Sequence, residues 1–342
     1  MTQTSTTVII LYMETICVTG AEGFIGSHLV EKLLGAGHRV KALIQYNSFN
    51  SLGWLKDVRS HKALEIVAGD VRDASQMLDF VKGSDRVIHL AALIAIPHSY
   101  SAPDSYFSTN VQGTLNLLNA SKASGVKRFV HTSTSEVYGS ALQVPISEDH
   151  PLQAQSPYSA SKIGADALAH SYWSSFELPV VILRPFNTFG PRQSFRAVIP
   201  TLLGQLLSGV NTIQLGATSP TRDFTFVDDT VEGFMKAMLA PGVEGQTINL
   251  GTGFEISISD LVHLAGTLLG RDVEIQADEA RLRPLGSEVD RLLSDNSKAA
   301  QLLGWEPQLV GIHGLKVGLQ ATMDWLSPRL GSDSSGVADY VR

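Results

Sequence analysis

Short apolar segments alternate with helix-forming segments along the first half of this chain, and this alternation limits the possible folds more than any other feature. Runs typical of strands occupy residues 15–19, 39–44, 64–68, 86–91, 127–132 and 179–184. Between them, apolar residues recur every three or four positions, as in helices, over residues 24–36, 73–82, 104–124 and 157–176. Strands that alternate with helices form parallel sheets through right-handed crossovers. The sequence therefore predicts an α/β, Rossmann-type, doubly wound parallel sheet.

This alternation ends after Arg184. Helices are predicted near 197–208, 230–239, 258–269, 296–303 and 312–326, with strands near 223–227, 247–250 and 272–276. We expect a smaller C-terminal lobe interleaved with the sheet. The dinucleotide-binding domain is assigned to 13–185 with about 223–250, and the substrate-binding lobe to 186–222 with 251–326. Residues 1–12 are expected to be an extension, and the Ser- and Gly-rich residues 327–342 a mobile tail.

Composition favours a small-molecule partner. The chain has 342 residues, of which 44% are hydrophobic, so it can bury a substantial core. Its net charge of −7 comes from mixed signs along the chain, which argues against nucleic-acid and membrane surfaces. No apolar stretch is long enough to span a bilayer. The single cysteine, Cys17, excludes a disulfide framework, and the cytoplasm is the expected location.

A glycine-rich turn follows the first predicted strand directly. Its sequence, GAEGFIG, supplies Gly20, Gly23, Phe24, Ile25 and Gly26 and opens a helix. Glycines let backbone N–H groups approach a pyrophosphate at the positive end of a helix. The spacing is GxxGxxG and is weak evidence alone, but its position between a strand and a helix predicts a dinucleotide site.

The choice between NAD and NADP stays open in the sequence. A carboxylate at the end of the second strand normally binds the adenosine ribose of NAD. Residues 42–48 here read ALIQYNS, with neither an acid nor an arginine. The absence of a cation for a 2′-phosphate favours NAD. Asp70, after the third strand, is expected either to contact the adenine or to cap a helix.

Tyr158 and Lys162 lie four residues apart in YSASK, at the start of a predicted helix. This spacing puts both side chains on one face. An ammonium near a phenol lowers the pKa of the phenol, which makes a phenolate able to act as a base near neutral pH. The pair therefore suits proton removal during hydride transfer at a carbinol.

Together with further motifs, these residues resemble the extended short-chain dehydrogenase/reductase family, NAD-dependent epimerases and dehydratases, over about residues 13–325. The matching pieces are HLAA (89–92), TNVQGT (109–114), STSEVYG (133–139), RPFNTFGPR (184–192), RDFTFVDD (222–229) and NLGTG (249–253). The resemblance implies cofactor contacts from the glycine turn, Tyr158 and Lys162, and also from a second set: Asp70, Val71, Leu90, Ala91, Ala92 and Asn110.

Within this family, the chain resembles the nucleotide-sugar 4,6-dehydratases. The resemblance implies that Thr134 binds the sugar 4-hydroxyl, that Tyr158 takes its proton, and that Glu136 removes the C5 proton. Water then leaves from C6 and the hydride returns there. The deoxythymidine-linked glucose dehydratases have Asp where this chain has Ser135, whereas GDP-mannose dehydratases share Thr-Ser-Glu. Serine is a poor acid, so we expect Glu136 to protonate the leaving hydroxyl as well.

Two other activities use related motifs. UDP-glucuronate decarboxylases also carry Thr-Ser-Glu, but they pair it with YDEGK rather than YSASK. Simple 4-epimerases usually lack a glutamate at the position of Glu136. A non-catalytic dinucleotide sensor is a further alternative, which the intact Thr134, Glu136, Tyr158 and Lys162 argue against.

Segments outside the expected catalytic motifs narrow the resemblance to one kind of dehydratase. Residues 45–55, 91–116 and 156–169 resemble the dehydratase of legionaminic acid biosynthesis, which acts on nucleotide-linked N-acetylglucosamine. Residues 283–295 are nearer to the GDP-mannose dehydratases, so UDP and GDP both remain possible. The resemblance implies diphosphate contacts from Arg192 and Arg222 and a nucleotide-sugar contact from Asn187.

Two remaining features concern metals and assembly. His89, His98 and His131 lie near the expected cleft, but none has a second ligand at metal-binding spacing, so no metal site is predicted. The helices over 104–124 and from Tyr158 onward resemble the pair that forms a four-helix dimer interface in this family. A homodimer is therefore expected, although apolar faces on both helices also fit an ordinary core.

Overall fold

The computed structural model describes residues 13–330 and is built around a seven-stranded parallel sheet. Its strand order is β3-β2-β1-β4-β5-β6-β10. The strands are β1 (Thr15–Thr19), β2 (Arg39–Gln45), β3 (Leu64–Gly69), β4 (Arg86–His89), β5 (Arg128–Thr132), β6 (Val180–Pro185) and β10 (Thr247–Leu250). On one side of β1 the sheet continues with β2 and β3, and on the other side with β4, β5, β6 and β10. The doubly wound sheet predicted from the sequence is confirmed.

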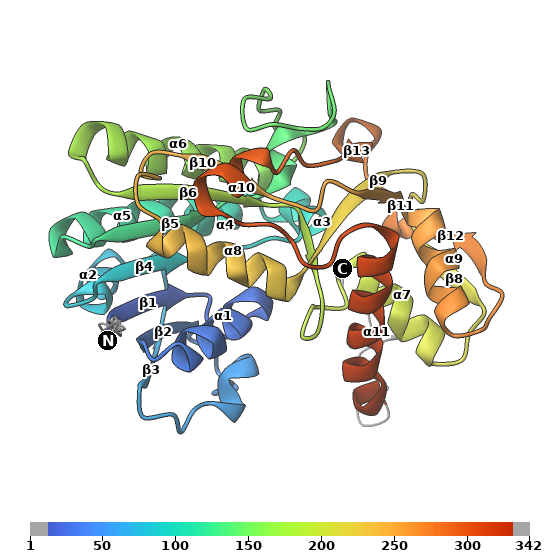
Figure 1. The fold of residues 1–342 in the computed structure, drawn as a ribbon, viewed down its shortest axis with the longest axis horizontal. Coiled ribbons are helices and arrows are strands. Elements are labelled where there is room, and N and C mark those ends of the chain that lie inside the picture. The colour runs from blue at the N-terminus through green and yellow to red at the C-terminus, as the bar shows by residue number, and fades with distance from the viewer. Residues whose placement is uncertain (1–12, 331–342) are drawn as a thin grey trace, which may run out of the picture.

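Helices cover both faces of this sheet (Figure 1). One face packs against α1 (Phe24–Gly35) and α8 (Val227–Leu239), and the other against α2 (Ala74–Val81), α5 (Gly113–Ser124) and α6 (Pro157–Phe176). Side chains along β1 alternate between the two cores, because successive residues of a strand point to opposite faces. Ile16 and Val18 join the first core, whereas Cys17 joins the second.

The helix predicted over residues 104–124 is interrupted. The chain forms α3 (Ile96–Ser101), α4 (Pro103–Tyr106), one π-helical segment η2 (Phe107–Gln112) and then α5. Such π-helical turns inside helices often occur at functional sites. Two 3₁₀ turns, η1 (Gly53–Asp57) and η3 (Ser135–Tyr138), follow β2 and β5.

A smaller lobe lies to the side of the large sheet (Figure 1). It contains β7 (Asn187–Phe189), β9 (Thr221–Phe226), β11 (Glu255–Ser257) and β13 (Arg291–Leu292) in one sheet, with β8 (Thr212–Leu215) paired to β12 (Glu274–Ala277). The helices α7 (Val198–Leu207), α9 (Ile258–Leu268) and α11 (Gly311–Leu330) pack together beside them, and α10 (Ser297–Leu303) packs on α8 and β10. The turns η4 (Glu279–Arg281) and η5 (Leu285–Ser287) complete it.

Two boundaries differ from those drawn on the sequence. The division at about residue 223 falls inside β9, and this strand pairs with β7, β11 and β13 rather than with the large sheet. α11 continues to Leu330, so residues 327–330 of the expected tail are helical. The rest of that tail and the expected extension at 1–12 lie outside the described residues.

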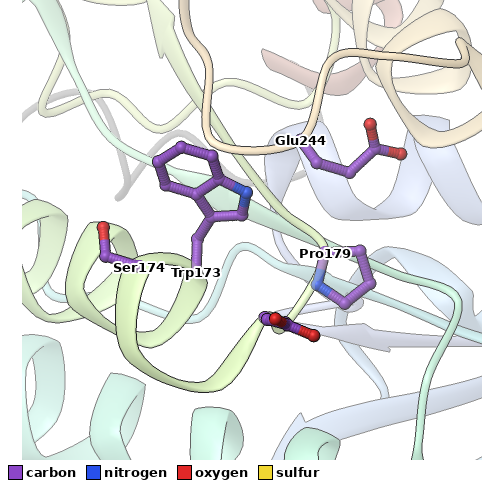
Figure 2. A pocket seen from close by; sticks show the side chains of 5 residues that line it. Trp173, Ser174, Pro179 and Glu244 are labelled. Carbon is purple, nitrogen blue, oxygen red and sulfur yellow. The ribbon is translucent and has the colours of Figure 1, made fainter.

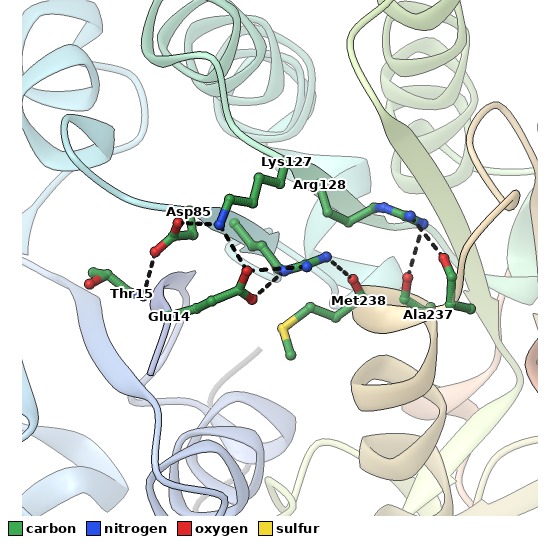
Figure 3. A network of polar contacts seen from close by, with 9 residues as sticks. Glu14, Thr15, Asp85, Lys127, Arg128, Ala237 and Met238 are labelled. Atoms are coloured by element: carbon green, nitrogen blue, oxygen red, sulfur yellow. Dashed lines mark hydrogen bonds and ion pairs between the residues drawn. The ribbon is translucent and has the colours of Figure 1, made fainter. Parts of the chain in front are cut away.

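Charged side chains join the N-terminal edge of the sheet to the end of α8 (Figure 3). Glu14 accepts hydrogen bonds from Arg86 and Lys127, and Lys127 also pairs with Asp85. Arg86 donates to the Met238 carbonyl at the C-terminus of α8. Cations are favoured there because the last carbonyls of a helix carry partial negative charge.

No helix within residues 13–330 is long and apolar enough to cross a membrane.

Candidate active site

The residues that the sequence singled out lie mainly at the carboxyl ends of adjacent parallel strands. The glycine turn follows β1, Asp70 follows β3, Leu90 follows β4 and Thr134 follows β5. The carboxyl ends of parallel strands share one edge of the sheet, where α/β proteins bind their ligands. The fold therefore places segments more than 100 residues apart in sequence along one edge.

The turn after β1 has the shape of a dinucleotide cradle. Gly20 has a φ of +64°, and a Cβ there would lie 2.8 Å from the Ala91 backbone nitrogen. A Cβ on Gly26 would lie 2.1 Å from the Gly20 carbonyl oxygen. Only glycine fits these two positions, which keep the first turn of α1 against the strand and the loop after β4. This close-packed turn at a helix N-terminus fits a pyrophosphate.

Asp70 does not cap a helix. The N-cap of α2 is Asp73, which accepts a hydrogen bond from the Gln76 backbone nitrogen at 3.0 Å. Asp70 instead accepts from the backbone and guanidinium nitrogens of Arg72, and these bonds lower the pKa of Asp70. Of the two roles weighed from the sequence, the capping role is wrong, and the expected contact with adenine stays a prediction.

Asn110 lies in the π-helical segment and holds the loop that follows β4. Its side chain accepts a hydrogen bond from the Leu93 backbone nitrogen and donates to the Leu93 carbonyl, each at 2.9 Å. It also donates to Ser161 on α6. Asn110 therefore shapes the site by fixing the segment just after Leu90, Ala91 and Ala92.

His89 is buried between two threonines. Its ring nitrogens lie 2.8 Å from Thr19 Oγ1 and 3.0 Å from Thr114 Oγ1. Burial lowers the pKa of His89 well below its usual value, so the ring is neutral near pH 7. Both ring nitrogens are therefore engaged, which fits a packing role for His89. Val71, in the turn after β3, packs closely against Gly113 of α5.

Thr134, Ser135 and Glu136 form the start of η3, directly after β5. Thr134 is the N-cap, and its hydroxyl accepts from the Glu136 backbone nitrogen at 3.2 Å. Ser135 is buried, whereas Thr134 and Glu136 are half-buried. The turn thus buries Ser135 and leaves its neighbours Thr134 and Glu136 partly exposed. Glu136 lies close enough to Tyr158 and Arg222 for its charge to influence the pKa of each.

Tyr158 lies in the first turn of α6, where the capping box of Ser156 and Ser159 starts the helix. Tyr106 packs edge-on against its ring at 6.2 Å, and only 6% of Tyr158 is exposed. Burial raises the pKa of Tyr158, a hydrogen bond with Thr134 lowers it, and the charge of Glu136 raises it further. The net shift is upward, opposite to the effect expected from Lys162, because burial outweighs the other contributions.

Lys162, one helical turn after Tyr158, is buried and donates a hydrogen bond to the Thr132 carbonyl. Burial lowers the pKa of Lys162 to about 8, while the negative charge of Asp166 acts in the opposite direction. Asp166 follows Lys162 by one helical turn. It was not predicted as a site residue, although its i+4 spacing from Lys162 could have identified it.

Asp166 is the centre of a buried polar network next to Lys162. Arg184 donates to Asp166 Oδ2 at 3.0 Å and to the Tyr138 hydroxyl at 2.9 Å, and Ser133 donates to Asp166 at 2.8 Å. His131 Nε2 lies 3.2 Å from the other carboxylate oxygen. Burial alone would raise the pKa of Asp166, but these cationic and hydrogen-bonding neighbours lower it. Asp166 therefore stays ionised beside Lys162.

A second cluster lies on the lobe side. Arg222, on β9, is only 6% exposed, and its guanidinium lies 3.5 Å from Glu288 Oε1. Arg283 lies 3.6 Å from the same oxygen, and its Nη1 is buried without a hydrogen-bond partner among the described residues. The Oδ1 atom of Asn187 on β7 is likewise buried and unpartnered within residues 13–330. Unpaired buried polar atoms are costly, so the Asn187 oxygen indicates a polar ligand.

Arg192 contacts different elements. It donates to Glu31 at 2.8 Å and to Ser27 at 3.2 Å, both on α1. Its backbone has a φ of +73°, which is uncommon outside glycine. Arg192 therefore lies beside the helix that begins at the glycine turn, whereas Arg222 and Arg283 meet at Glu288. Sequence spacing did not predict Arg283 at this position, because only the folded lobe brings the two arginines together.

A surface hollow lies at the opposite end of the sheet, where Trp173, Pro179 and Glu244 surround the start of β6 (Figure 2). Glu244 is bound there by Arg128. This hollow is separate from the edge that carries Tyr158 and Glu136.

Within residues 13–330, no group of three or more His, Cys, Asp or Glu side chains is arranged to hold a metal ion.

Comparison with known proteins identifies the family. The family model described as GDP-mannose 4,6 dehydratase matches residues 17–316. The dTDP-glucose 4,6-dehydratase of Streptomyces griseus is 36% identical, with 90% of this chain and 92% of that protein covered. The UDP-glucose 4-epimerase of Mycolicibacterium smegmatis is 35% identical, with 87% and 95% covered.

A solved structure agrees with these relatives. The dTDP-glucose 4,6-dehydratase of Streptomyces venezuelae, determined with NAD bound, is 32% identical and superimposes with a TM-score of 0.84. The comparison covers 93% of this chain and 98% of that one. The chain therefore belongs to the epimerase and dehydratase family of extended short-chain dehydrogenases/reductases, whose members act on nucleotide sugars.

Proposed function

We propose that the protein is a cytoplasmic nucleotide-sugar 4,6-dehydratase that uses NAD and converts UDP-N-acetylglucosamine to a UDP-4-keto-6-deoxy-N-acetylhexosamine, as in legionaminic acid biosynthesis. The observation that carries this proposal is the position of Glu136. Glu136 lies two residues after Thr134 in the turn that follows β5, and its charge acts to raise the pKa of both Tyr158 and Arg222. This supports a position near the group that would take the 4-hydroxyl proton and near a buried cation of the lobe. A base there suits the carbon next to C4.

The glycine turn, Asp70, the loop after β4 and Lys162 would hold the dinucleotide. When bound, NAD would supply the hydride acceptor for C4 and the hydride donor for C6, and its positive charge would favour the ionised form of Tyr158. Thr134 binds the 4-hydroxyl, and Tyr158 removes its proton. Oxidation at C4 makes the C5 proton acidic, so that Glu136 can remove it.

Protonated Glu136 then delivers the proton to the departing C6 hydroxyl. Ser135 is buried, and a hydroxyl is a weak acid, so the half-buried Glu136 is the better proton donor. The proton taken from C5 therefore leaves with the water. When hydride returns to C6, C5 takes a new proton, which Glu136 has gained from solvent, and Tyr158 releases the 4-hydroxyl proton to solvent. One carboxyl group thus serves in turn as base and as acid.

The lobe would bind the nucleotide diphosphate. Arg222 and Arg283 present two guanidinium groups around Glu288, and guanidinium forks match phosphate oxygens. Asn187 lies on β7, paired with Phe224 of the strand that carries Arg222. Its amide oxygen has no hydrogen-bond partner among the described residues and suits a sugar or base donor. Arg192, which donates hydrogen bonds to Ser27 and Glu31 of α1, would contact a phosphate nearer the dinucleotide.

A nucleotide-sugar 4-epimerase is the second candidate, favoured by the 35% identity to the mycobacterial epimerase. An epimerase needs Tyr158 but no base for C5. A GDP-linked substrate is supported by the match to the GDP-mannose dehydratase model. Incubation of the protein with UDP- and GDP-N-acetylglucosamine, followed by mass spectrometry, separates these possibilities. Loss of one water supports dehydration, whereas an unchanged mass with an altered sugar identifies an epimerase.

Replacement of Glu136 by Gln tests the central role directly. In deuterated solvent the variant should still oxidise C4, seen as transient absorbance of reduced nicotinamide, but should not introduce deuterium at C5. Tyr158→Phe is the matched comparison, because it should stop C4 oxidation itself. Normal deuterium incorporation by the Glu136 variant would refute its assignment as the C5 base.

We also propose a homodimer formed through the region of α4 to α6. Phe107, Trp173 and Phe176 in this region are exposed, with 61%, 37% and 48% of their surfaces accessible. Exposed aromatic side chains are enriched at protein interfaces. Light scattering coupled to gel filtration measures the mass in solution, and a monomer at micromolar concentration would contradict this proposal.

A further inference from the structure

The end of β2 lacks the carboxylate that usually reads the adenosine ribose. In Rossmann-type folds this acid binds the ribose 2′-hydroxyl of NAD, and a cation there accommodates the 2′-phosphate of NADP. The last residues of β2 are Leu43, Ile44 and Gln45, and none carries a charge. A residue from another part of the chain must therefore supply any charge at this position.

Glu22 brings a carboxylate to this point from the glycine turn. Its Oε1 atom accepts a hydrogen bond from the Gln45 backbone nitrogen at 2.7 Å, at the last residue of β2. Its Oε2 atom is buried and has no hydrogen-bond partner among the described residues. The side chain thus presents one occupied and one unsatisfied oxygen between the turn that cradles phosphate and the strand end that meets the ribose.

The surrounding backbone fixes Glu22 in this position. The Trp54 backbone nitrogen donates to the Glu22 carbonyl at 3.1 Å, and the Ala21 nitrogen donates to the Leu43 carbonyl at 3.2 Å. Gly53 lies on the side chain so closely that a Cβ there would be 2.8 Å from Glu22 Cβ. The turn and η1 therefore fix the backbone and the Cβ of Glu22, and the end of β2 positions its carboxylate through Gln45.

The cation at the neighbouring strand end is already engaged. Arg72 follows β3, and its guanidinium makes three hydrogen bonds to the Asp70 carboxylate, including Nε to both oxygens at 3.0 Å. A 2′-phosphate would have to break this ion pair to recruit Arg72. The local charge at the end of β2 is thus the negative charge of Glu22.

We propose that Glu22 is the residue that selects NAD over NADP. Its carboxylate replaces the missing acid of β2, accepts a ribose hydroxyl of NAD, and repels the 2′-phosphate of NADP. The inference rests on the NAD-dependent function proposed above, but only on its cofactor. It holds equally for a dehydratase and for an epimerase, so a failure of either assignment leaves the binding test unaffected.

Isothermal titration calorimetry of the full-length protein, freed of bound dinucleotide, tests this proposal without turnover. We expect NADH to bind at least about tenfold more tightly than NADPH, the effect of one charged hydrogen bond. Glu22→Gln keeps the side-chain shape and the oxygen that accepts from Gln45, but removes the charge. It should tighten NADPH binding by about tenfold and weaken NADH binding several-fold.

Glu65→Gln is the matched control, because it removes one negative charge from an exposed position on the neighbouring strand β3. Both dissociation constants should stay within about twofold of the starting protein, since exposed charges at a distance are screened by salt. A Glu22→Gln variant that folds and keeps the original NADH to NADPH ratio would overturn the proposal. Equal affinity of the unmodified protein for both dinucleotides would overturn it even without a folded variant.

Discussion

Replacement of Gly26 by alanine is the sharpest test of the dinucleotide cradle. The added methyl would lie 2.1 Å from the Gly20 carbonyl oxygen and 2.9 Å from Ala21 Cα, and both contacts are with backbone. Adding a methylene where side chains can move costs ~1–3 kcal/mol. No side chain can rotate away from this clash, so the turn itself must open. We expect a loss of about 3 kcal/mol or more in the free energy of unfolding, by extension of that range.

Gly35→Ala is the control, because it adds the same methyl to the same helix. A Cβ at Gly35 has no atom within 4 Å. Alanine is the better helix former, so this change should leave stability unchanged or raise it by up to about 1 kcal/mol. Urea unfolding without dinucleotide gives both free energies, and calorimetry gives the NAD affinities. Equal stability and equal NAD binding in the two variants would refute the reasoning about the cradle.

Three further predictions follow from the site and its support. Burial lowers the pKa of Lys162 to about 8, so this ammonium loses its proton, and turnover should fall, as pH rises through that value. Asp166→Asn removes the charge that raises this pKa and should move the alkaline limb of the pH–rate profile to lower pH; an unmoved limb contradicts the coupling. Arg283→Ala should weaken nucleotide-sugar binding by about 10- to 100-fold in calorimetry, whereas Arg291→Ala should not, because Arg291 is exposed and already paired with Glu255. Trp305→Ala should lower the free energy of unfolding in urea by ~3–5 kcal/mol, because this side chain is 1% exposed and donates a hydrogen bond to the Asp229 carbonyl. A loss below about 1 kcal/mol would contradict this expectation and would mean that the surrounding structure collapses into the cavity.

Local sequence was a good guide where the signal was periodic or glycine-specific. The alternation of apolar runs predicted the strands of the large sheet, because a buried parallel strand must be apolar on both faces. It misjudged the segment after Pro103, where a π-helical turn interrupts the helix. That turn is stabilised partly by Asn110, which reaches across to Leu93, and a contact between distant segments has no periodic signature.

The charge arrangement of the site was beyond local sequence. Tyr158 was expected to have a lowered pKa because Lys162 is four residues away, yet burial under Tyr106 raises it. Burial depends on segments that pack from elsewhere in the chain. The same reason explains why Arg283 was missed, since its neighbour Arg222 lies on a different strand and the two meet only at Glu288.

By itself, the sequence determined the sheet, the glycine turn after β1 and the identity of the residues that follow β5, because each depends on the chain's own neighbours. The tertiary structure decided which charges face one another. β2 ends without an acid, and Glu22 brings one to that end because the turn folds back onto Gln45. Electrostatic energy depends on distance and burial rather than on separation along the chain, so only the folded structure could assign these charges.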